Sequence, residues 1–109
     1  MNINVNDITI KMISAAKSVV GDKWSVTQSY FESESRIFAE RFASIANLRD
    51  GGLISESRAK KHVKFQKEAW ETVLLAVVGL NQIMVEQALN AALAAVSDIV
   101  NKAVGFALL

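Results

Sequence analysis

The sequence predicts an all-α protein, built as a long antiparallel helical hairpin that self-associates into a helical bundle. Three observations predict this class. Apolar residues recur every three or four positions through both halves of the 109-residue chain, which is the amphipathic spacing of helices. No segment of useful length alternates apolar and polar residues, and the chain has no proline. Two adjacent glycines at Asp50-Gly51-Gly52 mark the strongest turn. We expect a single helical domain over residues 1–109.

The first predicted helix covers about residues 7–49, with Asp7 or Asn6 as its N-cap. Its apolar stripe crosses Gly21-Asp22 without a change of phase, and an interior glycine costs a helix only about 1 kcal/mol relative to alanine. A continuous helix is therefore the simpler interpretation. The alternative is a break at Gly21, with Asp22 capping a new helix. The stripe consists of Ile13, Ala16, Val20, Trp24, Thr27, Phe31, Ser35, Phe38, Phe42 and Ile45.

The turn is expected at residues 50–54, and Ser55 is a suitable N-cap for a second helix of about residues 55–107. That helix would be about 80 Å long, a length that is typical of coiled coils and long bundles. Its stripe keeps its phase past Gly79. The stripe consists of Val63, Gln66, Trp70, Val73, Val77, Leu80, Met84, Ala88, Ala91, Ala95, Ile99 and Phe106.

Association of several chains is predicted from the composition of residues 72–109. This segment is apolar almost all round, and its only charged residues are Glu86, Asp98 and Lys102. A helix that is apolar on every side must be buried on every side, and one partner helix cannot do this. We therefore expect a homo-oligomer, a dimer or larger, and the arrangement also leaves room for a different protein partner. The expected oligomer interface consists of Trp70, Val77, Leu80, Met84, Ala88, Ala91, Ala92, Ala95, Ile99 and Phe106.

Membrane and export signals are weak in this sequence. The longest uncharged run, Thr72–Val85, is shorter than the roughly 20 apolar residues that a spanning helix needs. This favours a buried helix in a soluble assembly, although a membrane-contacting helix is the alternative. Residues 1–7 have neither a basic segment nor a compact apolar one. We expect a cytoplasmic protein, or one exported without a cleaved signal peptide.

Residues that could perform catalysis or bind a metal are few. The chain has no cysteine, and its one histidine, His62, lies among cations that repel a metal ion. Glu32 and Glu34 are two residues apart, so they do not face each other on a helix. Glu68 and Glu71 share a face, but no further ligand joins them there. No glycine-rich phosphate loop is present. We therefore expect no enzymatic activity, no cofactor and no metal site.

Charge is distributed unevenly along the chain. Residues 36–67 contain eight basic and three acidic side chains, and the predicted turn falls in the middle of this segment. One end of the rod should therefore be basic and suited to an acidic partner. The cluster from Arg58 to Lys67 has no aromatic interleaving beyond Phe65, and it matches no DNA-reading motif, so nucleic acid is not the expected partner. The predicted basic tip consists of Arg49, Arg58, Lys60, Lys61, Lys64 and Lys67.

The two tryptophans, Trp24 and Trp70, lie on the two apolar stripes and are expected to fill the core. In a hairpin that turns at Gly51 they would sit at different levels and form no common site.

The sequence thus predicts a non-enzymatic structural or protein-interaction module, a homo-oligomeric helical bundle with a basic tip as its docking surface. The alternative is a membrane-active or secreted helical hairpin that inserts its apolar C-terminal helix as a pore-forming protein would. In size and outline alone, the chain resembles the helical hairpins of bacterial secretion systems.

Overall fold

The structure is a computed structural model that describes residues 3–77 and 79–109. Four α-helices and one short 3₁₀ turn make up nearly all of it, and the described residues contain no strand. The predicted all-α class is therefore confirmed. The elements are α1 (Val5–Val20), the 3₁₀ turn η1 (Gly21–Lys23), α2 (Trp24–Asp50), α3 (Glu56–Leu75) and α4 (Gln82–Val104).

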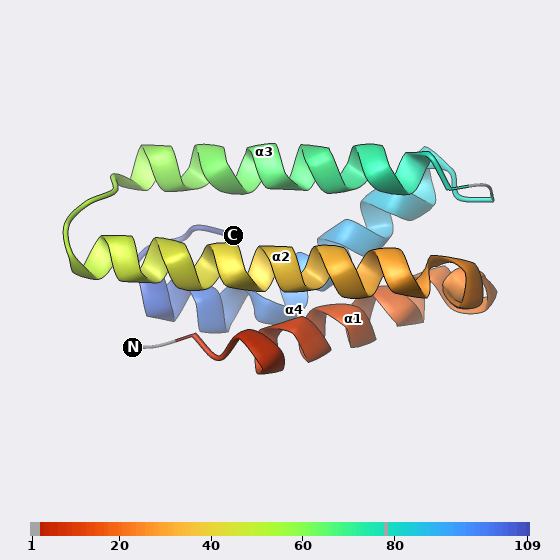
Figure 1. Cartoon of the computed structure of the whole chain (residues 1–109), viewed down its shortest axis with the longest axis horizontal. Coiled ribbons are helices and arrows are strands. Elements are labelled where there is room, and N and C mark those ends of the chain that lie inside the picture. The colour runs from red at the N-terminus through yellow and green to blue at the C-terminus, as the bar shows by residue number, and fades with distance from the viewer. Residues whose placement is uncertain (1–2, 78) are drawn as a thin grey trace.

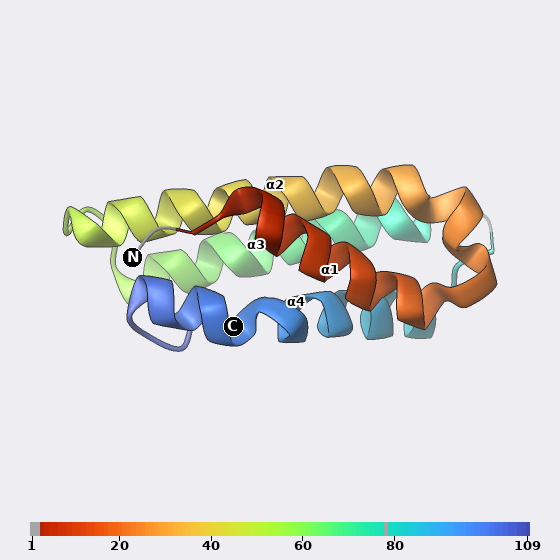
Figure 2. The same cartoon turned by 90° about the horizontal axis from the view of Figure 1, so that it is seen from below.

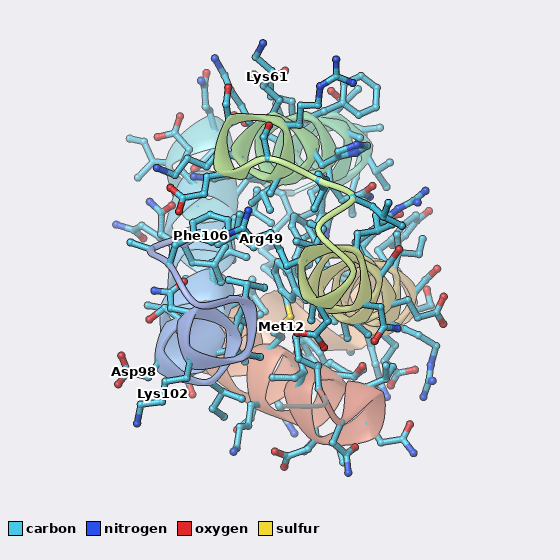
Figure 3. The ribbon with its side chains drawn as sticks, turned by 90° about the vertical axis from the view of Figure 1, so that its left-hand side faces the viewer. Met12, Arg49, Lys61, Asp98, Lys102 and Phe106 are labelled. Atoms are coloured by element: carbon cyan, nitrogen blue, oxygen red, sulfur yellow. The ribbon has the colours of Figure 1, made fainter. Side chains whose placement is uncertain are left out.

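The helices run alternately up and down and form an elongated bundle of 43 × 23 × 18 Å (Figures 1 and 2). Successive helices pack side by side, and α4 closes the bundle against α1. The helices α2 and α4 also approach each other across the middle, whereas α1 and α3 have no close backbone approach in the described part of the chain. The end-on view shows why, because α3 and α1 lie at opposite edges of the bundle (Figure 3).

The continuous first helix that we predicted over residues 7–49 is wrong. The chain bends at Gly21, where φ is 56° and ψ is −119°, values that a right-handed helix excludes. This is the alternative break, although Lys23 rather than Asp22 precedes the first residue of α2. The predicted caps also differ from the observed one, because the side chain of Asn4 accepts a hydrogen bond from the backbone N–H of Asp7 at 3.0 Å.

The turn between α2 and α3 is where the sequence predicts it. The helix α2 ends at Asp50, and the backbone N–H of Leu53 donates to the carbonyl of Leu48 at 2.8 Å. Ser55 is the N-cap of α3, and its hydroxyl accepts from the backbone N–H of Arg58 at 3.2 Å. The predicted cap is therefore confirmed.

The continuous second helix that we predicted over residues 55–107 is also wrong. The helix α3 ends at Leu75, and Gly79 has a φ of 95°, which a right-handed helix does not accommodate. Asn81 then starts α4, because its side-chain oxygen accepts from the backbone N–H of Met84 at 2.9 Å. Val78, which we placed inside the second helix, lies outside the described residues.

The core is contributed by all four helices and is buried within one chain. The buried stripe of α4 is displaced by one residue from most of the predicted positions, since its members are Val85, Ala88, Leu89, Ala92, Val96, Val100, Ala103 and Val104. The non-helical connection before α4 resets the helical phase, which the sequence pattern alone did not reveal. The predicted stripe of the first half is largely confirmed, since only Ile13 and Trp24 are partly exposed among its members.

A chain of aromatic rings links α2 to α3. Trp24 stacks on Phe31 with ring centroids 5.7 Å apart, and Phe31 contacts Trp70 edge-on at 5.8 Å. Phe38 contacts Trp70 on the other side at 5.3 Å. The two tryptophans therefore belong to one cluster, contrary to the prediction, because Phe31, two helical turns after Trp24 on α2, contacts both rings. Among the described residues, the buried Nε1 of Trp70 and Oγ of Ser35 have no hydrogen-bond partner.

The predicted oligomer interface is largely part of this intrachain core. Trp70, Ala88 and Ala92 are fully buried within one chain, and only Ala95 is exposed among the ten residues. The remaining six are partly buried. The broken helices bury their apolar faces on one another, so burial of these residues no longer requires a second chain. The homo-oligomer itself stays a prediction.

Candidate docking surface

The largest cluster of exposed cations lies on the outer face of α3 and the adjoining edge of α2. We define the basic face as Arg41, Arg58, Lys60, Lys61 and Lys64, all of which are exposed. The helical period places these α3 residues outside because Ala59, Val63 and Trp70 face the core. Lys61 points away from the bundle at the edge formed by α3 (Figure 3).

None of these five cations is neutralised by a carboxylate within the described part of the chain. The ion pairs found there are Lys11 with Asp7 at 3.1 Å and Arg49 with Glu56 at 3.9 Å. On α3 itself the acids stand at the boundaries, with Glu56 before the cluster and Glu68 and Glu71 after it. The basic face is therefore a short region of uncompensated positive charge, about two helical turns long on α3.

Two shallow hollows border the basic face, and Lys61 lines both. The hollow between α2 and α3 has a volume of about 640 Å³ and is lined by Arg41, Arg58, Lys61, His62, Phe65 and Gln66. The hollow on the other side of α3 has a volume of about 610 Å³ and is lined by Glu56, Ser57, Lys60, Lys61 and Lys64. Phe65 is 73% exposed, so an apolar ring stands among the cations.

Two residues of the predicted basic tip make internal bonds instead. Arg49 is partly buried, donates a hydrogen bond to the carbonyl of Ile54 at 3.1 Å, and lies 5.1 Å from the ring centroid of Phe106. Lys67 donates to the side-chain oxygen of Asn90 at 3.0 Å and thereby ties α3 to α4. The other four predicted cations belong to the basic face, which extends along the side of α3 and not only over the tip.

Arg41 is the member of the basic face that sequence reasoning missed. It lies on α2, and its place beside Arg58 and His62 depends on the register between α2 and α3. The turn at Gly51-Gly52 sets that register. Helical periodicity shows on which side of its own helix a residue lies. It does not show the residue's axial position relative to the neighbouring helix, so no sequence signal placed Arg41 beside α3.

The C-terminal segment supports the bundle beneath α3. The side-chain oxygen of Asn101 accepts hydrogen bonds from the backbone N–H groups of Leu108 at 2.9 Å and Leu109 at 3.0 Å. Phe106 lies between the cations of Arg49 and Lys60, at 5.1 and 6.0 Å from its ring centroid. Figure 3 shows Arg49 and Phe106 directed toward each other. These contacts hold the C-terminal segment against α4 and place Phe106 beside α3.

His62 and Glu34 are titratable residues outside the set of cations that defines the basic face. His62 lines the hollow between α2 and α3 beside Arg58 and Lys61, which the sequence predicted, and beside Arg41, which it did not. Partial burial raises the pKa of the Glu34 carboxyl above its usual value. In residues 3–77 and 79–109, no group of three or more His, Asp or Glu side chains is placed to hold a metal ion.

The helix α4 is long and apolar enough to cross a membrane when judged by length and composition. Its most apolar window has a mean hydropathy of 1.4, and 33% of that window is buried inside the bundle. The core helix of a soluble protein meets the same criteria.

Comparisons with known proteins gave no relatives: no family model, no curated protein and no solved structure matches this chain.

Proposed function

We propose that this protein is a non-enzymatic docking module whose basic face binds a short acidic segment of a partner protein. The observation that carries the proposal is the uncompensated charge, with five exposed cations on one face and no carboxylate within 4 Å of any of them among the described residues. Unpaired cations of this density favour an anionic partner and accelerate its association.

The boundaries of the basic face favour a short partner segment over an extended polyanion. Glu68 and Glu71 lie on the next turns of α3 and would repel a nucleic acid strand or an anionic membrane that continued along the helix. The basic part of α3, from Arg58 to Lys64, spans only about 10 Å at 1.5 Å per residue. An acidic peptide of a few residues covers this length.

The exposed ring of Phe65 favours a protein segment that also carries an apolar side chain. Phe65 lines the hollow between α2 and α3 together with Arg41 and Arg58. An apolar side chain seated on this ring would be buried between the two guanidinium groups while its neighbouring carboxylates pair with them. Charge then provides the rate of association, and the ring contributes to selectivity.

The proposal is tested by fluorescence anisotropy with a short labelled peptide that is rich in Asp and Glu and has one central Leu. We expect binding that weakens as salt rises, because screening reduces the attraction. The double variant Lys61→Glu/Lys64→Glu should bind about tenfold more weakly, since each reversal exchanges an attraction for a repulsion.

A matched control separates the basic face from net charge. The variant Lys17→Glu/Lys102→Glu makes the same change in charge at exposed positions of α1 and α4, and it should bind almost as well as the wild type. An equal loss in both variants would contradict a localised site. A single-stranded oligonucleotide and anionic vesicles are tested in the same assay. If either binds more tightly than the peptide, the partner is a nucleic acid or a membrane and the proposed protein partner is wrong.

A membrane-active protein is the second candidate function, and the length and apolar composition of α4 favour it. In that case α4 would leave the bundle and insert. Flotation with anionic liposomes tests this candidate directly. Protein that stays at the bottom of the gradient contradicts insertion, whereas protein that floats and resists extraction by high salt supports it.

A further inference from the structure

We propose that two copies of this chain exchange α1 and form a domain-swapped dimer in which Gly21 is the hinge. The partner is a second copy of the chain, and the exchanged surface is the buried face of α1. That face consists of Ile8, Thr9, Met12, Ala16 and Val20. This inference does not depend on the basic face or on its partner.

The hinge is confined to one residue with non-helical angles. Val20 and Trp24 have right-handed helical backbone angles, and so does Lys23, whereas Gly21 has φ 56° and ψ −119°. These are the angles of the first central position of a type II′ turn, which glycine adopts and other L residues avoid. Rotation at Gly21, with a small adjustment of the 3₁₀ turn after it, would align α1 and α2 in one helix.

The sequence is compatible with that straight helix. The apolar stripe passes from Ala16 through Val20 and Trp24 to Thr27 at intervals of three or four residues. An open chain would therefore present a single continuous apolar face over α1 and α2. The same pattern supports the closed monomer and the opened form, and only the angles at Gly21 distinguish them.

Exchange would preserve nearly all of the burial in the closed chain. In the closed chain α1 packs against α2 and α4. In the dimer it would make the same contacts with α2 and α4 of the second copy, so only the hinge differs. The balance between the two forms is then set by the hinge conformation and the protein concentration, as in domain swapping generally.

The hinge end of the bundle also carries apolar surface that a second copy would cover. Exposed fractions there are 58% for Val26, 42% for Leu75 and 69% for Ile83. Figure 1 shows η1 and the connection between α3 and α4 at this same end of the rod. Straightening at Gly21 would bring the hinge ends of two copies together, and burial of these side chains would stabilise the junction.

The test is the variant Gly21→Ala, with Gly105→Ala as its matched control. Both glycines have positive φ, and neither has an atom within 4 Å of the position that a Cβ would take. Gly105 is the C-cap of α4, and residues 106–109 after it form no helix, so straightening it joins no two of the described helices. Alanine is disfavoured at both, but only at Gly21 can dimerisation relieve the strain.

Light scattering after size exclusion gives the mass. We expect Gly21→Ala to have twice the 11.9 kDa mass of one chain at every concentration, and Gly105→Ala to show the same concentration-dependent proportions of monomer and dimer as the wild type. Small-angle scattering should show that the Gly21→Ala dimer is about twice as long as the 43 Å closed chain. A monomeric Gly21→Ala that loses as much stability as Gly105→Ala would overturn the proposal.

A third variant distinguishes an exchanged dimer from simple contact between exposed apolar ends. Adding Ile83→Lys to Gly21→Ala should leave an exchanged dimer intact, because its main interface is the face of α1. A dimer that Ile83→Lys dissociates would contradict the exchange.

If Gly21→Ala does not fold, the wild type is refolded from denaturant at high concentration. A dimer that dissociates only slowly on dilution then supports the proposal, and exclusively monomeric protein overturns it.

Discussion

The helices α1 and α3 pack on opposite sides of the α2–α4 pair, yet they are bound to it in different ways. The helix α1 approaches α2 and α4 closely and has its one ion pair, Lys11 with Asp7, within itself. The helix α3 approaches them less closely and carries four cations of the basic face. This difference teaches that the bundle has a structural side and an accessible charged side. We locate folding stability on the first and binding on the second.

The largest expected effect comes from a charge in the buried face of α1. Met12 is fully buried, so Met12→Asp should lower the free energy of unfolding by more than about 3 kcal/mol, because the carboxylate would have no partner there. The control on α3 is Phe65→Asp, at a side chain that is 73% exposed, which should change stability by less than about 0.5 kcal/mol. Urea unfolding measures both. Similar losses of unfolding free energy in the two variants would contradict the difference that we infer between the α1 side and the α3 side.

Removing the side chain that anchors the C-terminal segment should lower the free energy of unfolding by less than Met12→Asp does. Asn101→Ala deletes the acceptor for the backbone N–H groups of Leu108 and Leu109. We expect a loss of about 1–2 kcal/mol in the free energy of unfolding. Hydrogen exchange should show that amides of α3 lose more protection than those of α1. Equal loss of protection in both helices would contradict a separate α3 side.

Trp70→Phe should have a smaller effect, although Trp70 is fully buried. The substitution removes apolar area, but it also removes the Nε1 donor that has no partner among the described residues. The two contributions oppose each other, so we expect a net change within about 1 kcal/mol. Thermal unfolding of the variant measures it. A loss near 3 kcal/mol would show that the indole N–H is satisfied and that α3 is anchored more firmly than we infer.

The smallest effect concerns Glu34 on α2, whose pKa is raised by burial. A raised carboxyl pKa means that the folded chain binds this proton more tightly than the unfolded chain does. Glu34 therefore reduces stability above its folded pKa, and this penalty disappears as pH falls toward the unfolded value. Glu34→Gln should add roughly a few tenths of a kcal/mol at neutral pH and nothing in mild acid. A gain that persists at low pH would exclude titration as its cause.

Sequence reasoning identified the helical class, the turn at Gly51-Gly52 and the Ser55 cap because each depends on local patterns. It missed the break near Gly79, after which the buried stripe of α4 is shifted by one residue, and it preferred a continuous helix to the alternative break at Gly21 because the apolar stripe keeps its phase there. Periodicity cannot register a backbone rotation that leaves the spacing unchanged. Asn81 was a usable signal, since Asn is a favoured N-cap and the chain after it is strongly helical.

The residues of the candidate site that could be predicted from the sequence are also those that depend on local patterns. Arg58, Lys60, Lys61 and Lys64 are predicted because they are close in sequence on one helix. Arg41 required the register of two helices, and the internal bonds of Arg49 and Lys67 depend on contacts with Phe106 and Asn90. Those contacts exist only after the second half of the chain has folded back.

The most direct test of the account is a map of amide chemical shifts during titration with the Leu-containing acidic peptide. We expect the largest shifts in residues 57–67 of α3 and around Arg41, and no more than small shifts in α1. The shifts should fade as salt is added, since the contact is electrostatic. Shifts concentrated on α1 or α4, or no shifts at low salt, would contradict the assignment of binding to the basic face.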